Sequence, residues 1–131
     1  AVGINNLMAT DGQIGVTWPF VIRKILQQDN LDDALDCITS ANLAGAHNYM
    51  LMDKHGDGYN VEAMSTEIHI DTLENNSIAH TNPCVVDKTL NVARPRTPEA
   101  QIGTENRLNR AYEILADGNV TTDALSNRPL P

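Results

Sequence analysis

Apolar residues recur with a helical period in the first third of the chain. Pro19, which suits a first helical turn, opens a stretch to about Gln28 whose apolar face consists of Val21, Ile22, Ile25 and Leu26. Asn30 is a good N-cap for a second stretch, whose apolar stripe consists of Leu31, Ala34, Leu35 and Ile38 and which Gly45 follows. The pattern predicts two consecutive helices that need another layer to pack on.

From Ala46 onward the period changes to two. Residues 46–53 and 59–64 flank Gly56-Asp57-Gly58, and Asp-Gly between two alternating runs is typical of a hairpin turn. Residues 67–71 alternate as well, 74–76 form the next turn, and 77–82 are predicted to be the last strand. Residues 2–10 are interpreted as a buried strand that precedes the helices. We expect an antiparallel meander.

The remainder of the chain is predicted to hold a loop and one long helix. Residues 86–103 contain Pro95 and Pro98 and show no period, so they are interpreted as a loop. Thr104 is the expected cap of a helix to about Ala116, and a short helix is expected near 121–125. The order of elements predicts an α+β fold, one partial domain over residues 1–128 with a tail at 129–131.

Composition and charge narrow the class of protein. The 131 residues, 41% of them hydrophobic, suit one domain with a real core, and no apolar run is long enough for a transmembrane helix. A formal net charge of -8 argues against nucleic acid as a partner. The first residues show no secretory signal, which favours the cytoplasm but leaves the compartment open. No nucleotide-binding fingerprint is present, and no cofactor is predicted.

The most suggestive polar stretch runs from Ser77 to Cys84. His80, Thr81 and Asn82 are adjacent there, and Pro83 has no N–H to donate to a sheet, so Asn82 is expected at a strand end. Clustered side-chain donors at a strand end fit a functional site. They also fit a polar strand end whose groups bond locally, and the residues alone favour this second interpretation.

Other candidate chemistry is weaker. Asp53, His55 and Asp57 lie in a hairpin that resembles a cation-binding loop, but the twelfth position is Met64 instead of a bidentate Glu, so a plain turn is favoured. The four histidines show no close metal-ligand spacing, and no metal site is predicted. The two cysteines, 37 and 84, are interpreted as buried thiols.

Several stretches, in order, resemble the isopenicillin N acyltransferase family of N-terminal-nucleophile hydrolases. The most specific is His80-Thr81-Asn82, which is similar to the family's His-Thr-Asn-His strand. The others are Val2-Gly3-Ile4-Asn5-Asn6-Leu7, Gly15-Val16 with Pro19 and Ile22-Arg23, the helix with Asp33-Ala34, the hairpin from Ala46 to Val61-Glu62, and Thr104-x-x-Arg107-x-x-Arg110 before Glu113-Ile114-Leu115. The resemblance covers about residues 2–127.

The resemblance implies a two-sheet αββα sandwich, of which this chain supplies a middle portion. Family members cut themselves to expose an N-terminal cysteine, which attacks an amide, ester or thioester carbonyl of a small acyl substrate with its own α-amine as base. By this resemblance Asn82 donates its side-chain amide to the oxyanion. His80 and Thr81 hold Asn82 in place, and Glu62 is a structural partner on the neighbouring strand.

Three departures from the family pattern shape the functional expectation. Ala1 is not a cysteine, Pro83 replaces the second His of the strand motif, and the family's last strands do not follow Pro131. We therefore expect an excised segment that is inactive by itself and needs the remainder of its parent chain, with open strand edges that favour a homodimer. The alternative is a non-catalytic α+β binding module on an inherited scaffold.

Overall fold

A computed structural model describes residues 1–73 and 77–118. Its sheet has four strands, β1 (Val2–Asn6), β2 (His47–Met52), β3 (Gly58–Ala63) and β4 (Ile68–Thr72), in the spatial order β1-β2-β3-β4. All neighbouring strands are antiparallel. The long connection from β1 to β2 carries two helices, so β1 joins the sheet beside β2 and not through a hairpin. The predicted α+β class is confirmed.

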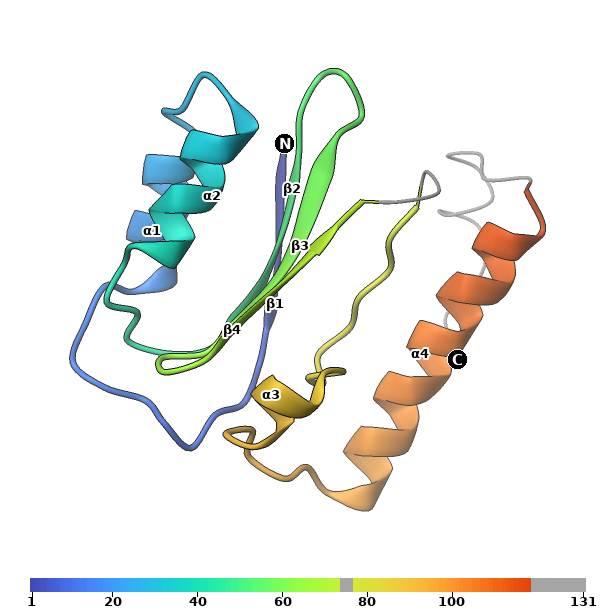
Figure 1. The fold of residues 1–131 in the computed structure, drawn as a ribbon. Helices are drawn as coiled ribbons and strands as arrows, with labels where there is room; N and C mark the ends of the chain where they lie inside the picture. Colours follow the sequence, from blue (N-terminus) through green and yellow to red (C-terminus); the bar gives the residue numbers. More distant parts are fainter. Residues whose placement is uncertain (74–76, 119–131) are drawn as a thin grey trace.

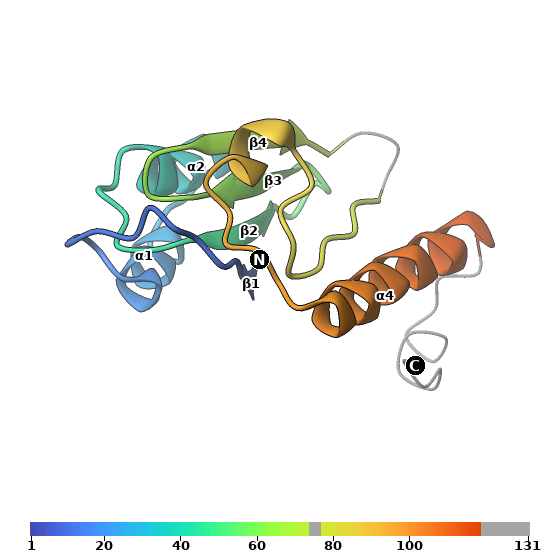
Figure 2. The same cartoon turned by 90° about the horizontal axis from the view of Figure 1, so that it is seen from below.

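Helices lie on both sides of this sheet. Figure 1 shows α1 (Trp18–Ile25) and α2 (Leu31–Thr39) against one face, and α4 (Pro98–Ala116) on the opposite side. Residues 77–86 run between the sheet and α4, and the short α3 (Asp87–Leu90) follows them (Figures 1 and 2). No helix in the described ranges combines the length and the apolarity needed to cross a membrane.

The face under α1 and α2 is the apolar core. The predicted cap of α2 is present, since the Asn30 side chain accepts a hydrogen bond of 2.8 Å from the backbone N–H of Asp33. The buried residues of this core are Val21, Ile25, Ala34, Cys37, Ile38, Leu43, Tyr49, Leu51, Val61 and Ala63. Burial of these side chains provides the main driving force for docking the two helices on the sheet.

The other face of the sheet is polar and nevertheless buried. One row of directly paired positions crosses all four strands and consists of Asn5, Asn48, Glu62 and His69. Asn48 and Glu62 are fully buried, and the Asn48 amide donates to Asn60 at 2.9 Å. Polar groups removed from water need hydrogen-bond partners, so whatever covers this face must supply them.

The prediction of a strand at 77–82 is wrong. These residues are extended but pair with no strand in the described part of the chain. Side chains satisfy their carbonyl groups instead: Asn5 donates to the carbonyl of His80 at 3.0 Å, and Tyr112 to that of Ala79 at 3.2 Å. Alternating polar and apolar residues form a β-strand only when the backbone of a neighbouring strand is available for hydrogen bonding.

The start of the last helix was also predicted wrongly. Thr97, not Thr104, is the cap, because its hydroxyl accepts from the N–H of Ala100 at 3.3 Å and Pro98 occupies the first turn. Thr104 lies buried inside α4. The predicted loop 86–103 therefore contains α3 and the first six residues of α4. The turn at 74–76, the short helix near 121–125 and the tail lie outside the described residues.

Gly15 is needed where the connection after β1 packs against residues 42–44. A Cβ at this position would lie 2.2 Å from the carbonyl oxygen of Asn42. We predict that Gly15→Ala lowers the free energy of unfolding by about 1–3 kcal/mol, measured by urea unfolding. Gly45→Ala is the control, because its Cβ would meet nothing within 4 Å. Equal stability of both variants would contradict the packing account.

Candidate functional site

A buried carboxylate lies at the centre of the polar face. The Glu62 side chain on β3 is fully buried, and its Oε1 is 2.8 Å from Nε2 of His80 and accepts from the backbone N–H of Val85 at 2.8 Å. Its Oε2 accepts from the hydroxyl of Thr89 on α3. One carboxylate thus binds three points of the chain between residues 80 and 89.

The charge state of Glu62 follows from these contacts. Burial raises its pKa, but hydrogen bonds from His80, Thr89 and the Val85 amide lower it, and the net pKa lies below the ordinary value of 4.5. Glu62 is therefore ionised at neutral pH inside the protein. The facing side chain of His80 is only 1% exposed.

The segment that carries His80 is also bound from its other side by α4. The hydroxyl of Thr81 donates to the backbone carbonyl of Thr104 at 3.3 Å, next to the Tyr112 contact described above. The structure thus brings His80 and Glu62 together, whereas Thr81 points to α4. Residues 78–85 are held between the polar sheet face and α4 by side chains.

Asn82 has three partners, one on β1, one on α4 and one in the loop that precedes α4. Its Nδ2 donates to the backbone carbonyl of Asn6, at the end of β1, at 3.1 Å. Its Oδ1 accepts from the guanidinium of Arg107 on α4 at 3.1 Å, and its main-chain carbonyl accepts from Arg96 at 2.8 Å. The amide Nδ2 carries two N–H groups and makes one hydrogen bond among the described residues, so its second N–H has no partner in the part of the chain that the structure describes.

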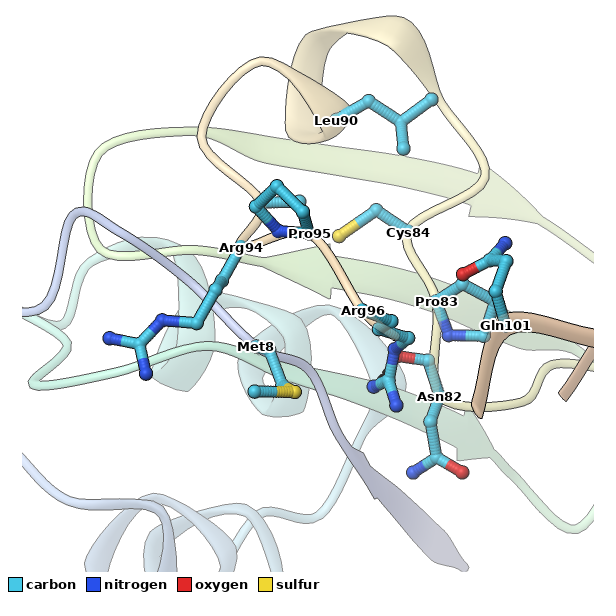
Figure 3. Close-up of a pocket in the computed structure, with 10 residues that line it drawn as sticks. Met8, Asn82, Pro83, Cys84, Leu90, Arg94, Pro95, Arg96 and Gln101 are labelled. Atoms are coloured by element: carbon cyan, nitrogen blue, oxygen red, sulfur yellow. Dashed lines mark hydrogen bonds between the residues drawn. The ribbon is translucent and has the colours of Figure 1, made fainter. Parts of the chain in front are cut away.

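A pocket of about 250 Å³ lies beside Asn82. Figure 3 shows Arg94, Arg96, Cys84 and Gln101 around it, and shows the side-chain amide of Asn82 extending away from Cys84 toward β1. The main chain of Asn82 therefore forms the wall of the pocket, while its amide group faces the β1 edge of the sheet. A substrate bound by the amide would lie along that edge.

The two cysteines are buried, as their sequence positions indicated. Cys84 is 6% exposed, and its sulfur lies 3.8 Å from the sulfur of Met64. Cys37 is 5% exposed in the core under α2. Burial raises the pKa of both thiols. Both cysteines are therefore poor nucleophiles.

The hairpin at residues 53–57 has the structure of a turn. Oδ1 of Asp53 accepts from the backbone N–H of His55 at 2.7 Å and from that of Asp57 at 3.1 Å. Within residues 1–73 and 77–118, no three His, Cys, Asp or Glu side chains converge in a way that could hold a metal ion. The carboxylate of Asp53 thus stabilises the loop backbone, and nothing here favours a cation site.

Sequence reasoning missed several of the residues around Asn82. Thr89 and Arg96 lie in a stretch without period, and their contacts depend on how α3 and α4 fold back on the sheet. The position of Asn5 in a predicted buried strand indicated that its amide needs a hydrogen-bond partner. That partner is the carbonyl of His80. Arg107 was noted only as part of the helix motif.

Together, the fold and the site define an α+β domain with an oriented side-chain amide donor at the end of a segment held on a polar sheet face. A family model described as acyl-coenzyme A:6-aminopenicillanic acid acyl-transferase matches residues 1–127. The chain belongs to this acyltransferase family, in agreement with the resemblance of its sequence stretches. No curated protein matches the chain in a sequence comparison.

The Glu62 contacts predict a pH dependence of stability. The folded-state pKa of Glu62 lies below that of an unfolded chain, so its contribution is present above about pH 4.5 and is lost as the pH falls through the folded-state value. We predict that Glu62→Gln lowers the free energy of unfolding by about 1–3 kcal/mol at pH 7 and by less at pH 3.

Urea unfolding at a series of pH values measures this difference. Glu67→Gln is the matched control, because Glu67 forms a surface pair with Lys88 at 3.2 Å and should change stability by less than about 1 kcal/mol. If the Glu62→Gln difference were the same at pH 7 and pH 3, the charge of the carboxylate would not be the stabilising feature.

Burial of the two cysteines predicts their reactivity. In the native protein, both thiols should react with a disulfide reagent only through opening of the structure, and both should react at once in concentrated urea. The measurement is the time course of labelling, followed through the thiol that the reagent releases when it reacts with a cysteine. Rapid labelling of Cys84 in the native state would show that it is accessible and would reopen its assignment as an inert thiol.

Proposed function

We propose that this chain supplies the oxyanion-binding part of a self-processing cysteine N-terminal-nucleophile enzyme, an amidase or acyltransferase for small acyl substrates. Membership of the acyltransferase family supports the class of reaction. The observation that carries the assignment of a role is the environment of Asn82, whose amide is oriented by partners on both ends and keeps one N–H free among the described residues.

The proposed reaction uses an N-terminal cysteine from the parent protein. Its sulfur attacks the substrate carbonyl while its α-amine takes the thiol proton, and the carbonyl oxygen becomes an oxyanion. The free N–H of Asn82 donates to this oxyanion, a contribution of about 2.7–4 kcal/mol to the transition state. Collapse breaks the bond to the leaving group, which takes the proton, and leaves a thioester. Water or an amine then attacks the thioester and gives up a proton to the α-amine, the carbon–sulfur bond breaks to release the acid or the amide, and the cysteine sulfur takes that proton back from the α-amine.

The nucleophile in this proposal comes from outside the 131 residues. Cys37 and Cys84 are buried, have raised thiol pKa values and cannot present an α-amine as base. The proposal therefore holds that the 131-residue chain alone turns over no acyl substrate. In the same scheme, Glu62 and His80 act on the reaction only by holding the segment that leads to Asn82.

The second candidate function is a non-catalytic binding module on the same scaffold. The contact that favours it is the hydrogen bond from Asn82 to the carbonyl of Asn6, which uses part of the amide's donor capacity for the protein itself. In this case Asn82 would fasten residues 78–85 to the end of β1 and contact no substrate. The two candidates differ in what the Asn82 side chain does for turnover.

Replacement of Asn82 separates the two functions. In the full-length protein, Asn82→Ala should lower kcat about 10²–10³-fold with little change in KM, because an oxyanion donor acts mainly in the transition state. Turnover is measured with p-nitroanilide amides of acetic, hexanoic and phenylacetic acid. Asn91→Ala, at the exposed end of α3, is the control.

Intact mass of the same full-length protein tests the nucleophile. Two fragments that sum to the precursor, the second starting with cysteine, are the expected result. A single uncleaved chain that turns over none of the three amides would leave the binding module as the better description.

A further inference from the structure

Arg107 on α4 donates a hydrogen bond to the side-chain amide of Asn82. Its Nη2 lies 3.1 Å from Oδ1 of Asn82 and 3.0 Å from the hydroxyl oxygen of Thr104, and its Nη1 donates to the carbonyl of Gly103 at 3.1 Å. The guanidinium is thus fixed by the helix that carries it. It is half-buried, so its position is set by packing as well as by hydrogen bonds.

The partners of Asn82 determine which end of its amide faces which way. A guanidinium has only donors, so the amide atom that it contacts must be the oxygen. A backbone carbonyl has only acceptors, so the atom that faces Asn6 must be the nitrogen. Rotation of the amide by 180° would place N–H against guanidinium and oxygen against carbonyl, and both contacts would become repulsive.

The charge of Arg107 adds to this orienting effect. In the part of the chain that the structure describes, Arg107 forms no ion pair, in contrast to Arg110 one turn later, which pairs with Glu113 at 2.6 Å. A cation on Oδ1 polarises the amide and makes its N–H groups stronger donors. The positive charge also lies one amide group away from where the proposed oxyanion forms.

We infer that Arg107 is the positioning residue of the oxyanion donor: its guanidinium fixes the amide of Asn82 with Nδ2 toward the substrate and strengthens that donor. The inference rests on the proposed function of Asn82. The inference adds Arg107 to that function. Because Arg107 lies on α4, the docking of α4 would set how strongly Asn82 donates to the oxyanion.

The test is a double-mutant cycle in the full-length protein, with the p-nitroanilide that is turned over fastest. Arg107→Gln should lower kcat on the order of 10–10²-fold with KM nearly unchanged, since a misplaced donor weakens mainly the transition state. In an Asn82→Ala background the same substitution should cause less than about a twofold further fall, because its target is gone. Arg107→Lys, which keeps the charge and a donor, should recover part of kcat.

Arg110→Gln is the matched control on the same helix and should leave kcat unchanged, with the Tm of every variant recorded. An equal fall for Arg107→Gln in both backgrounds would mean that Arg107 acts through folding and would overturn the inference. So would full activity of Arg107→Gln while Asn82→Ala is impaired. If Asn82→Ala alone is fully active, the proposed function itself fails, and the cycle shows that failure separately. Should Arg107→Gln not fold, Arg107→Lys against Arg107→Lys/Asn82→Ala completes the same cycle.

Discussion

The arrangement of this domain depends on one ionised carboxylate in a dry interior. Glu62 lies on β3, an inner strand of the sheet, and is fully buried. Removal of a charge from water is costly unless hydrogen-bond donors pair with it. The donors come from His80, from the Val85 amide and from Thr89. The segment between the sheet and α4, together with α3, therefore both covers this carboxylate and supplies the donors that pair with it.

This requirement explains why the two faces of the sheet are covered so differently. On the α1 and α2 side, the packed side chains are apolar and need no hydrogen-bond partners. On the other side, an extended segment without strand pairing lies over the polar face and exchanges specific hydrogen bonds with Asn5, with Glu62 and with α4. Such bonds fix a segment in one register, because a shift by one residue would break all of them. A single register also fixes the position of Asn82 relative to β1 and α4.

Local patterns predicted most of the elements but little of this arrangement. The cap of α2 at Asn30, the hairpin of β2 and β3, and the α+β class followed from period and turn chemistry. The alternation of residues 77–82 predicts a strand, but the partners of this segment are side chains. The start of α4 was missed because Thr97-Pro98 opens a helix whose first turns carry no apolar stripe. Contacts such as Arg107 with Asn82 depend on packing between distant elements, which periodicity does not encode.

Two partners of the Asn82 side chain lie far from it in the sequence, one before it and one after it. This side chain bridges the last residue of β1, 76 positions earlier, and α4, 25 positions later. Of the described elements, β1 is synthesised first and α4 last, so the amide acquires both partners only after α4 has been made and has docked. The orientation of this amide therefore depends on the docking of elements that are far apart in the chain.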